Sequence, residues 1–417
     1  MMLALQMYRS PAKYAAGRAL TAAGTVLRTS MPGLRVGPMA PLRLAQIEEP
    51  TISRPGWARV KPRLSGICGS DLGMLTGLTS LYFSPMVSFP FVPGHEIVGD
   101  LVDDCEDLPA GTRVVMDSVL SCAARGVEPC ANCQAGTTNL CDRVTVGHVA
   151  PALQTGLCAD TGGGWGQQML VHRSQLHVVP DGLDDERAVL AEPLACAARL
   201  AERAKVPDGA TVLVSGAGAV GLFAVLALRQ LTPAGRIMVV AKHSRQRELA
   251  RAFGATDVVR PDETMRAVRR ATGAHRVSGI EFRAGPGATS MQMARTPDLL
   301  LGGADVSIDC VGSAGSLNLA LSCTRAGGRV VLSGMPGPGV DLSAAWFREL
   351  EVSGSYASSG HAFDTALRLA AEAPLDGLVS GRYPLAQWRE ALDHAHSVGR
   401  LGGVKVCFDT RGQRGRR

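Results

Sequence analysis

The pattern of hydrophobic and polar positions changes near Glu186. Before it, between about Ala40 and Pro180, apolar residues fall in short β-branched runs separated by Gly, Pro and Cys, and long amphipathic patterns are few. Such runs are typical of strands joined by turns. We therefore predict an irregular, mostly β domain, with strands over Trp57–Val60, Ile97–Val102, Arg113–Met116, Met169–Val171 and His177–Val179.

After Glu186, helical patterns alternate with short apolar runs. The predicted helices cover Arg187–Lys205, Val220–Leu231 and Arg245–Phe253, and the predicted strands cover Thr211–Ser215, Arg236–Val240, Asp257–Arg260, Asp305–Cys310 and Arg329–Ser333. Strands that alternate with helices form parallel βαβ units. This part of the chain is therefore predicted to be α/β, with a doubly wound sheet.

The remaining segments complete the predicted organisation. Met1–Ser10 has the pattern of a first strand that ends in a turn at Pro11, and Thr272–Leu301, which lacks a clear period, has that of an inserted loop. Beyond Gly354 the chain is predicted to return to the first domain, through helices near Ala362–Ala373 and Trp388–His396 and a last strand at Gly403–Phe408. The predicted boundaries are 1–185 for the first part of the β domain, 186–350 for the α/β domain and 351–417 for the return segment.

Composition and charge argue against two classes of protein. Of the 417 residues 46% are hydrophobic, but no run approaches the roughly 18 apolar residues of a membrane span. The net charge of +6 arises at the ends, because residues 1–47 hold six Arg or Lys and no acid, and residues 411–417 hold four Arg. Subtracting these ten leaves 33 basic residues against 37 acidic ones, which argues against a nucleic-acid groove. Because a secretory pattern is also missing, we expect a soluble protein of the cytoplasm.

Four cysteines gather in one loop rich in Gly and Asn. Cys122, Cys130, Cys133 and Cys141 have the spacing C-x7-C-x2-C-x7-C. Four thiolates this close in sequence can surround one tetrahedral zinc ion, and a closed four-cysteine site is structural because it leaves no open coordination position. We therefore predict a structural zinc site in this loop; the alternative is that these are scattered buried or free cysteines that bind no zinc.

A second set of candidate metal ligands is spread more widely along the chain. Cys68 lies in Gly-Ile-Cys-Gly-Ser-Asp, His95 and Glu96 lie in Gly-His-Glu, and Glu192 lies in Ala-Glu-Pro-Leu-Ala. A thiolate, an imidazole and a carboxylate suit a catalytic zinc, which keeps one position for water or substrate. The sequence therefore offers a catalytic zinc site with more than one candidate carboxylate.

A glycine motif indicates a dinucleotide cofactor. G-x-G-x-x-G follows the predicted strand Thr211–Ser215 directly and opens an apolar helix. Its glycines allow a tight turn, close approach of the pyrophosphate and close helix packing, while the start of the helix faces the phosphates. In this context the motif is a strong signal, and the expected cofactor contacts are Gly216, Gly218, Val220 and Gly221.

The end of the next strand bears on the choice of cofactor. NAD sites usually present an acid there to the adenosine ribose hydroxyls. Ala241 occupies that place here, and cations follow it, so Lys242, His243 and Arg245 are candidate contacts for a 2′-phosphate. We predict a preference for NADP; NAD held without the acid is the alternative.

Taken together, these motifs resemble those of the zinc-containing medium-chain alcohol dehydrogenases. The resemblance runs from about Ala40 to the last strand, and the motifs occur in the family's order. Besides those already named, they include Asn139-Leu-Cys141, Glu192-Pro193, Asp309-Cys-Val-Gly312 and Gly327-Gly-Arg-Val-Val331. The resemblance implies a GroES-like, mostly β catalytic domain, split in sequence around an inserted Rossmann domain. It also implies a small-molecule substrate and a homodimer or homotetramer.

The resemblance assigns roles to individual residues. It implies that Cys68 and His95 bind the catalytic zinc together with a carboxylate, either Glu96 or Glu192. The fourth ligand is then either Glu192 or water. Ser70 matches the hydroxyl that relays the alcohol proton. Asp71 matches a carboxylate behind the zinc ligands, and Lys405 is its possible basic partner. Zinc would polarise the substrate oxygen while a hydride passes to or from the nicotinamide.

Three points remain open at the level of sequence. Many members have a second relay histidine where this chain has Gly73, so the proton path beyond Ser70 is not defined. A zinc-bearing reductase of a C=N or C=C bond in a biosynthetic pathway is the alternative function. Four apolar residues form either a wall of the substrate pocket or ordinary core beneath a loop: Leu81, Tyr82, Phe83 and Met86.

Overall fold

The computed structural model describes residues 1–27, 40–51, 54–279, 298–337 and 339–411. The chain forms two compact units, one of Met1–Arg199 with Tyr356–Arg417 and one of Leu200–Ser355. The second unit therefore begins within helix α7 (Ala191–Ala204) rather than at its start. None of the described helices is long and apolar enough to cross a membrane.

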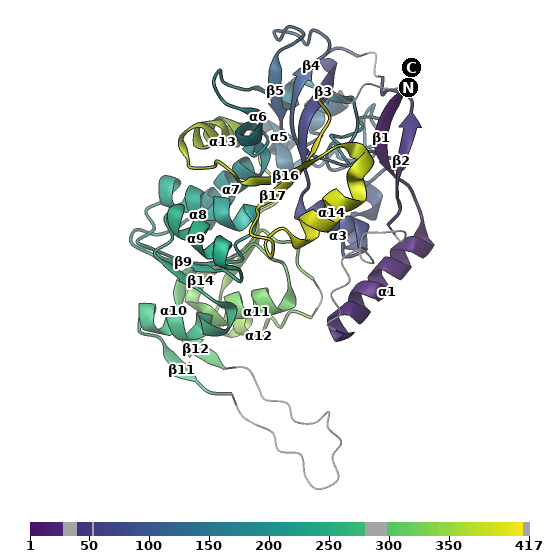
Figure 1. The fold of residues 1–417 in the computed structure, drawn as a ribbon. Helices are drawn as coiled ribbons and strands as arrows, with labels where there is room; N and C mark the ends of the chain where they lie inside the picture. Colours follow the sequence, from purple (N-terminus) through teal and green to yellow (C-terminus); the bar gives the residue numbers. More distant parts are fainter. Residues whose placement is uncertain (28–39, 52–53, 280–297, 338, 412–417) are drawn as a thin grey trace. The chain divides into compact units, whose positions relative to one another are not determined.

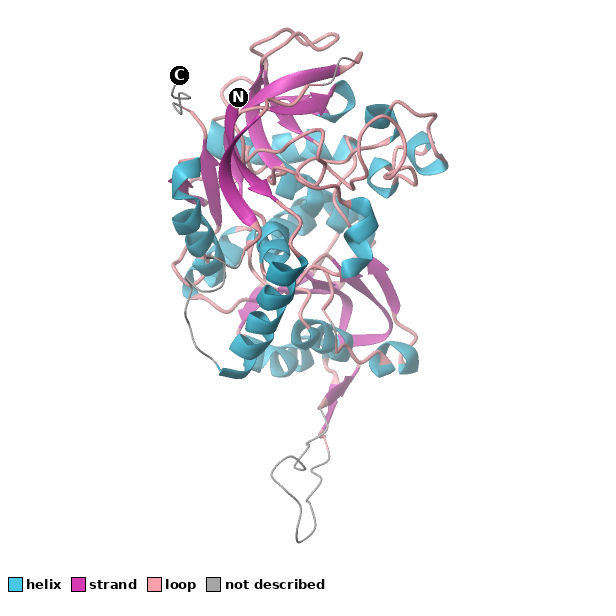
Figure 2. Cartoon of the chain, turned by 90° about the vertical axis from the view of Figure 1, so that its right-hand side faces the viewer, coloured by secondary structure: helices cyan, strands magenta, loops and turns pink. Residues whose placement is uncertain are grey.

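The first unit is built on a mostly antiparallel seven-stranded sheet (Figure 1). Its path is β16 (Val379–Tyr383), β17 (Lys405–Asp409), β3 (Trp57–Gly66), β4 (Glu96–Leu101), β5 (Arg113–Met116) and β7 (Leu176–Val178), with β6 (Met169–His172) also paired to β3. The five strands predicted for this region are confirmed. Loops, pink in Figure 2, occupy much of this unit, as the density of Gly and Pro predicts.

The register of this sheet brings distant residues together at Gly66. In the β3–β4 pair, Gly66 lies opposite Glu96, and in the β17–β3 pair it lies opposite Cys407. The C-terminal strand predicted from the sequence is confirmed as β17, so the return segment delivers Lys405 to this end of the sheet. Helices α13 (His361–Glu372) and α14 (Trp388–Ser397) are also confirmed.

The N-terminal hairpin differs from the prediction. Strand β1 (Met2–Met7) pairs with β2 (Leu42–Ile47), and Met7 lies opposite Leu42, so residues 8–41 are inserted at the turn. The predicted turn at Pro11 is wrong, because Pro11 begins helix α1 (Pro11–Leu27), purple in Figure 1. Proline fits the first turn of a helix, where its missing N–H has no partner to lose, and the alanines that follow favour helix.

The second unit is a parallel six-stranded sheet with helices between its strands. The strand order is β10 (Asp257–Val259), β9 (Arg236–Val240), β8 (Thr211–Ser215), β13 (Ala304–Asp309), β14 (Thr324–Leu332) and β15 (Glu351–Gly354). The chain leaves β8 toward β9 and returns on its other side at β13, which confirms the doubly wound α/β prediction and creates a switch point there. Helices α8 (Ala219–Leu231) and α9 (Ser244–Ala252) follow β8 and β9 as predicted.

Two helices of this unit were not among those predicted from the sequence. They are α10 (Thr264–Thr272) and α11 (Ala314–Cys323). The predicted inserted loop contains a short hairpin, β11 (His275–Val277) with β12 (Leu299–Leu301), and its residues 280–297 lie outside the described residues.

Candidate functional site

The cysteine of the first motif caps a helix. Strand β3 runs into Cys68, which is the N-cap of α3 (Gly69–Leu75), and the Cys68 N–H donates to Asp71 Oδ2 at 3.0 Å. The other Asp71 oxygen lies 3.5 Å from His95 Nδ1. The buried Asp71 therefore orients two candidate ligands at once, which is the usual task of a carboxylate behind a metal site.

Three candidate ligand atoms converge at this point. Those of Cys68, His95 and Glu96 all lie within 4.8 Å of one another, and His95 and Glu96 are buried. Burial opposes the charged form of the His95 imidazole, yet Asp71 and Cys68 raise its pKa. The donor set of thiol, imidazole and carboxylate fits a catalytic zinc ion.

Two glycines make this convergence possible. A Cβ on Gly66 would lie 2.1 Å from Glu96 Oε2, so a side chain at Gly66 would displace the carboxylate. Gly94 has φ +100, and a Cβ there would lie 2.5 Å from the Trp165 ring. Glycine tolerates this left-handed conformation, which aims the following His95 at the site.

The structure corrects the predicted partner of Lys405. Its Nζ donates to Glu96 Oε1 at 2.7 Å and to Glu96 Oε2 at 2.6 Å, whereas Asp71 is engaged with His95 and Cys68. Lys405 is 4% exposed and Glu96 1% exposed, so the pair is fully desolvated. The reason is the sheet register, which places the start of β17 and the start of β4 on either side of the end of β3.

Glu192 is the second buried carboxylate of the site. It lies in the first turn of α7, and its Oε1 accepts a hydrogen bond from Cys196 Sγ at 3.3 Å. Burial raises its pKa, and the charges of His95 and Glu96 act on it in opposite directions. The charges of two of the three converging ligands therefore act on Glu192, although its oxygens are not among the atoms within 4.8 Å.

The predicted relay residue Ser70 is exposed on α3, and its hydroxyl makes no hydrogen bond to any described residue. Where a relay histidine is missing at Gly73, the nearest group to an added Cβ is Thr79 Oγ1, at 3.8 Å. The apolar residues around Leu81 and Tyr82 lie in the 3-10 helix η1 (Leu81–Met86), and none of them is buried. The alternative that they are ordinary core residues is therefore wrong.

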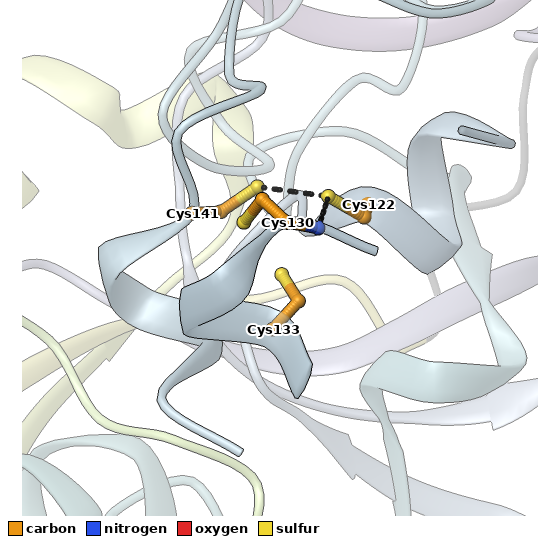
Figure 3. Close-up of side chains that lie close together, drawn as sticks. All are labelled: Cys122, Cys130, Cys133 and Cys141. Carbon is orange, nitrogen blue, oxygen red and sulfur yellow. Dashed lines mark hydrogen bonds between the residues drawn. The ribbon is translucent and has the colours of Figure 1, made fainter. Parts of the chain in front are cut away.

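The four-cysteine loop closes as predicted (Figure 3). All four sulfur atoms lie within 4.8 Å of one another, with 3.5 Å between those of Cys122 and Cys141. Backbone N–H groups of Asp142 and Cys133 lower the pKa of the Cys130 thiol to about 6, which favours the thiolate that metals bind. The cluster fits a closed, structural zinc site.

Arg125 holds the start of this loop, a role that the sequence did not indicate. The side chain is completely buried and donates to four carbonyl oxygens, those of Leu120, Val146, Val149 and Ala152. These bonds connect the short helix α4 (Cys122–Arg125) to the chain after the loop. They fix Cys122 in the cluster, although seven residues separate it from Cys130 in the sequence.

The glycine motif has the geometry of a dinucleotide site. Gly216 has φ +97, and a Cβ on Gly221 would lie 2.0 Å from Gly216 O, so the turn and the helix pack without room for side chains. Gly218 is the N-cap of α8 and faces open space, and Val220 is half-buried in the first turn. The motif lies at the switch point between β8 and β13, where open α/β sheets bind their ligands.

The predicted 2′-phosphate contacts follow strand β9. Ala241 is buried, Lys242 is exposed and His243 is the N-cap of α9, but Arg245 already pairs with Glu248 at 3.1 Å. Arg247, which the sequence did not single out, donates to Lys242 O at 3.0 Å. A second guanidinium therefore lies beside the predicted contacts.

Comparison with known proteins agrees with this architecture. Residues 54–181 match the alcohol dehydrogenase GroES-like domain family, and residues 219–372 match the zinc-binding dehydrogenase family. An uncharacterised zinc-type alcohol dehydrogenase-like protein of Haemophilus influenzae is 30% identical over 314 residues, covering 73% of this chain and 77% of the relative. The L-idonate 5-dehydrogenase of Vitis vinifera is 27% identical over 361 residues, covering 84% and 87%.

A solved structure shares the fold. It is a zinc-binding dehydrogenase of Sinorhizobium meliloti bound to NADP, 28% identical, with a TM-score of 0.65 over 88% of this chain and 95% of that one. The order of the sequence motifs, the closed cysteine cluster and the glycine-rich turn all agree with such a protein.

Proposed function

Because this chain belongs to the zinc-containing medium-chain alcohol dehydrogenase family, we propose that it acts on a polyhydroxylated alcohol, with NADP as its preferred cofactor. The family membership makes it an enzyme that transfers a hydride between a nicotinamide cofactor and an alcohol or carbonyl group. The proposal for the substrate is supported by the relative from Vitis vinifera, named for L-idonate, a polyhydroxy acid. We place the enzyme in the cytoplasm.

The proposed catalytic centre consists of Cys68, His95, Glu96 and Glu192. The observation that carries it is the convergence of the first three within 4.8 Å from two parts of the chain, Cys68 after β3 and the His95–Glu96 pair at the start of β4. Both Glu96 oxygens already accept hydrogen bonds from Lys405, whereas Glu192 accepts one from a weak thiol donor. Glu192 is therefore the carboxylate that is freer to complete the coordination of a metal ion.

The protein's own residues position the reaction. Zinc, when bound, supplies a Lewis acid for the substrate oxygen. Asp71 holds His95 and the Cys68 backbone, and Lys405 holds Glu96. Ser70, exposed on α3 two residues from Cys68, is the hydroxyl proposed to receive the alcohol proton. From there the proton passes to water, because Gly73 offers no side chain.

Kinetics with both cofactors test this proposal. We expect kcat/KM to be at least about tenfold higher with NADP than with NAD, because charge-assisted hydrogen bonds to a 2′-phosphate contribute about 1.5–3 kcal/mol. Lys242→Ala should reduce that ratio, and the matched variant Lys61→Ala, on β3, should leave it unchanged. A clear preference of the wild type for NAD would refute the cofactor proposal. Turnover of enals or imines without any turnover of alcohols would favour the reductase alternative.

We also propose a homodimer. Strand β15 is an edge of the parallel sheet, and in the same unit Trp346 and Phe347 are 84% and 67% exposed. Open edges and large exposed apolar side chains are usually covered in a stable assembly. Light scattering should give a mass near twice 43.6 kDa. The charged variant Trp346→Glu should shift the mass toward that of one chain, and a wild-type monomer would contradict the proposal.

A further inference from the structure

Arginine side chains gather around a cavity in the first unit. Its volume is about 530 Å³, within the range of sites that hold small ligands. The buried Leu375 lines it, and so does Gly377, where φ is +73 and an added Cβ would meet no atom within 4 Å. Five arginines also line it: Arg63, Arg113, Arg187, Arg382 and Arg411. No candidate zinc ligand or predicted cofactor contact is among the described residues that line this arginine cavity, so it is not part of the proposed catalytic centre.

The arginine cavity lies where the return segment meets the first part of the chain. Arg63 is on β3 and Arg113 is on β5. Arg382 is on β16, and Arg411 follows β17. Asp185, the first residue of the short helix α6 (Asp185–Ala188), joins three of them. Its Oδ2 lies 3.0 Å from both Arg63 Nε and Arg411 Nη1, and its Oδ1 lies 3.3 Å from Arg113 Nη1. Because Asp185 is 7% exposed, a buried carboxylate fixes these guanidinium groups before any ligand binds.

Three of the five arginines hold the wall of the cavity. Arg63 donates through Nη1 to Asp100 Oδ1 at 3.3 Å. Arg411 donates to Asp409 through Nε at 3.0 Å and through Nη2 at 2.6 Å. Arg187 donates to three carbonyl oxygens at the end of α13. These bonds use groups outside the lining, so the three arginines connect the cavity to the surrounding strands and helix.

The other two arginines keep N–H groups for a ligand. A guanidinium has five N–H donors. Arg113 donates to two acceptors among the described residues, Asp185 Oδ1 and Pro180 O, each at 3.3 Å. Arg382 donates to one, Glu186 Oε1, at 2.6 Å. Arg113 and Arg382 therefore have more donors than the described part of the chain supplies with acceptors.

The acids that line the cavity are more exposed than its free arginine Arg113. The side chains of Asp376 and Glu186 are 82% and 37% exposed, and Asp184 is also exposed, whereas the side chain of Arg113 is 25% exposed. Water screens the charge of exposed acids, so their ion pairs are weak. Asp185 is the only buried acid among the described lining residues, and three arginines share it. The inner part of the cavity therefore attracts negative charge.

We infer that the arginine cavity binds a small molecule with two phosphate groups, held by Arg113 and Arg382. A phosphate group offers three acceptor oxygens and up to two negative charges, and the planar guanidinium binds it through two parallel hydrogen bonds. Arg113 belongs to the first part of the chain and Arg382 to the return segment, so a ligand with two such groups can engage both sides. The site is distinct from that of the nicotinamide cofactor, whose predicted contacts lie in the second unit. The inference does not depend on the proposed substrate.

Calorimetric titration with pyrophosphate tests this inference. The full-length protein is first saturated with its preferred nicotinamide cofactor, which occupies the glycine motif. We expect one pyrophosphate per chain with a Kd below about 1 mM, and weaker binding as salt is added. Arg113→Gln and Arg382→Gln should each raise the Kd at least about tenfold, because each removes charge-assisted hydrogen bonds. Asp376→Asn, which removes an exposed negative charge from the rim, should lower the Kd by about twofold.

The matched control is Arg368→Gln, at an exposed arginine of α13 that does not line the cavity, and it should leave the Kd unchanged. Binding of pyrophosphate to zinc would be the same in all these variants, so differences between them report on the cavity. Arg382 does not contact the buried Asp185, so its variant tests the site even if Arg113→Gln unfolds the protein. Succinate should bind at least about tenfold more weakly than pyrophosphate. Absence of binding to the wild type, an equal Kd in the wild type and Arg382→Gln, or equal affinity for succinate would overturn the inference.

Discussion

Replacing Cys68 by alanine is expected to abolish turnover and leave the fold intact. Substitutions behind a metal site already cost about 10–100-fold in affinity or activity, so loss of a direct ligand should lower kcat/KM by more than about 100-fold. The fold should persist because Cys68 is a half-buried helix cap whose contact with Asp71 uses the backbone N–H, which alanine retains. Kinetics on an alcohol substrate and circular dichroism would measure the two outcomes.

A matched control for this variant is Cys323→Ala. Cys323 is fully buried in the core of the second unit, at the end of α11, and belongs to neither cluster of candidate ligands. The Cys323→Ala variant should lose some stability, because the substitution leaves a small cavity, but it should keep its turnover. If Cys68→Ala retains the activity of this control, Cys68 has no role in catalysis.

The second large effect is expected at Lys405. Replacing it by methionine leaves the Glu96 carboxylate buried and unpaired, which typically destabilises a protein by about 3–5 kcal/mol. Denaturant unfolding of the Lys405→Met variant should therefore show a free energy of unfolding lower by about that amount. The double variant Lys405→Met with Glu96→Gln should recover much of the loss, because it removes the uncompensated charge.

Lys61→Met serves as the control for this prediction. Lys61 is exposed on β3, the strand that pairs with β17, so the same change there should alter stability by less than about 0.5 kcal/mol. If the Lys405→Met variant is as stable as this control, the buried Lys405–Glu96 pair does not stabilise the fold.

Local pattern accounts for most of what the sequence predicted. The strands around Thr211 and Arg236 and the helices that follow them have short-range periodicity, and the metal and glycine motifs place their chemistry within a few residues. Such signals depend on neighbours along the chain, which a single sequence displays fully. Helix α1 was missed because Pro11 reads equally as a turn and as a first helical residue.

The features that the sequence did not predict are long-range contacts. Lys405 and Glu96 are 309 residues apart, and their pairing depends on which strands are neighbours in the sheet. Arg125 is also of this kind, because an arginine in a loop ordinarily faces solvent, and only the folded loop supplies its four carbonyl partners.

The zinc content of the purified enzyme tests the central claim most directly. The two clusters of candidate ligands predict about two zinc ions per chain in the wild type and about one in Cys68→Ala, whose four-cysteine site is intact. Mass spectrometry of the metal content would measure both. A wild-type protein that holds no metal, while still transferring hydride to or from an alcohol, would contradict the account of its catalytic centre.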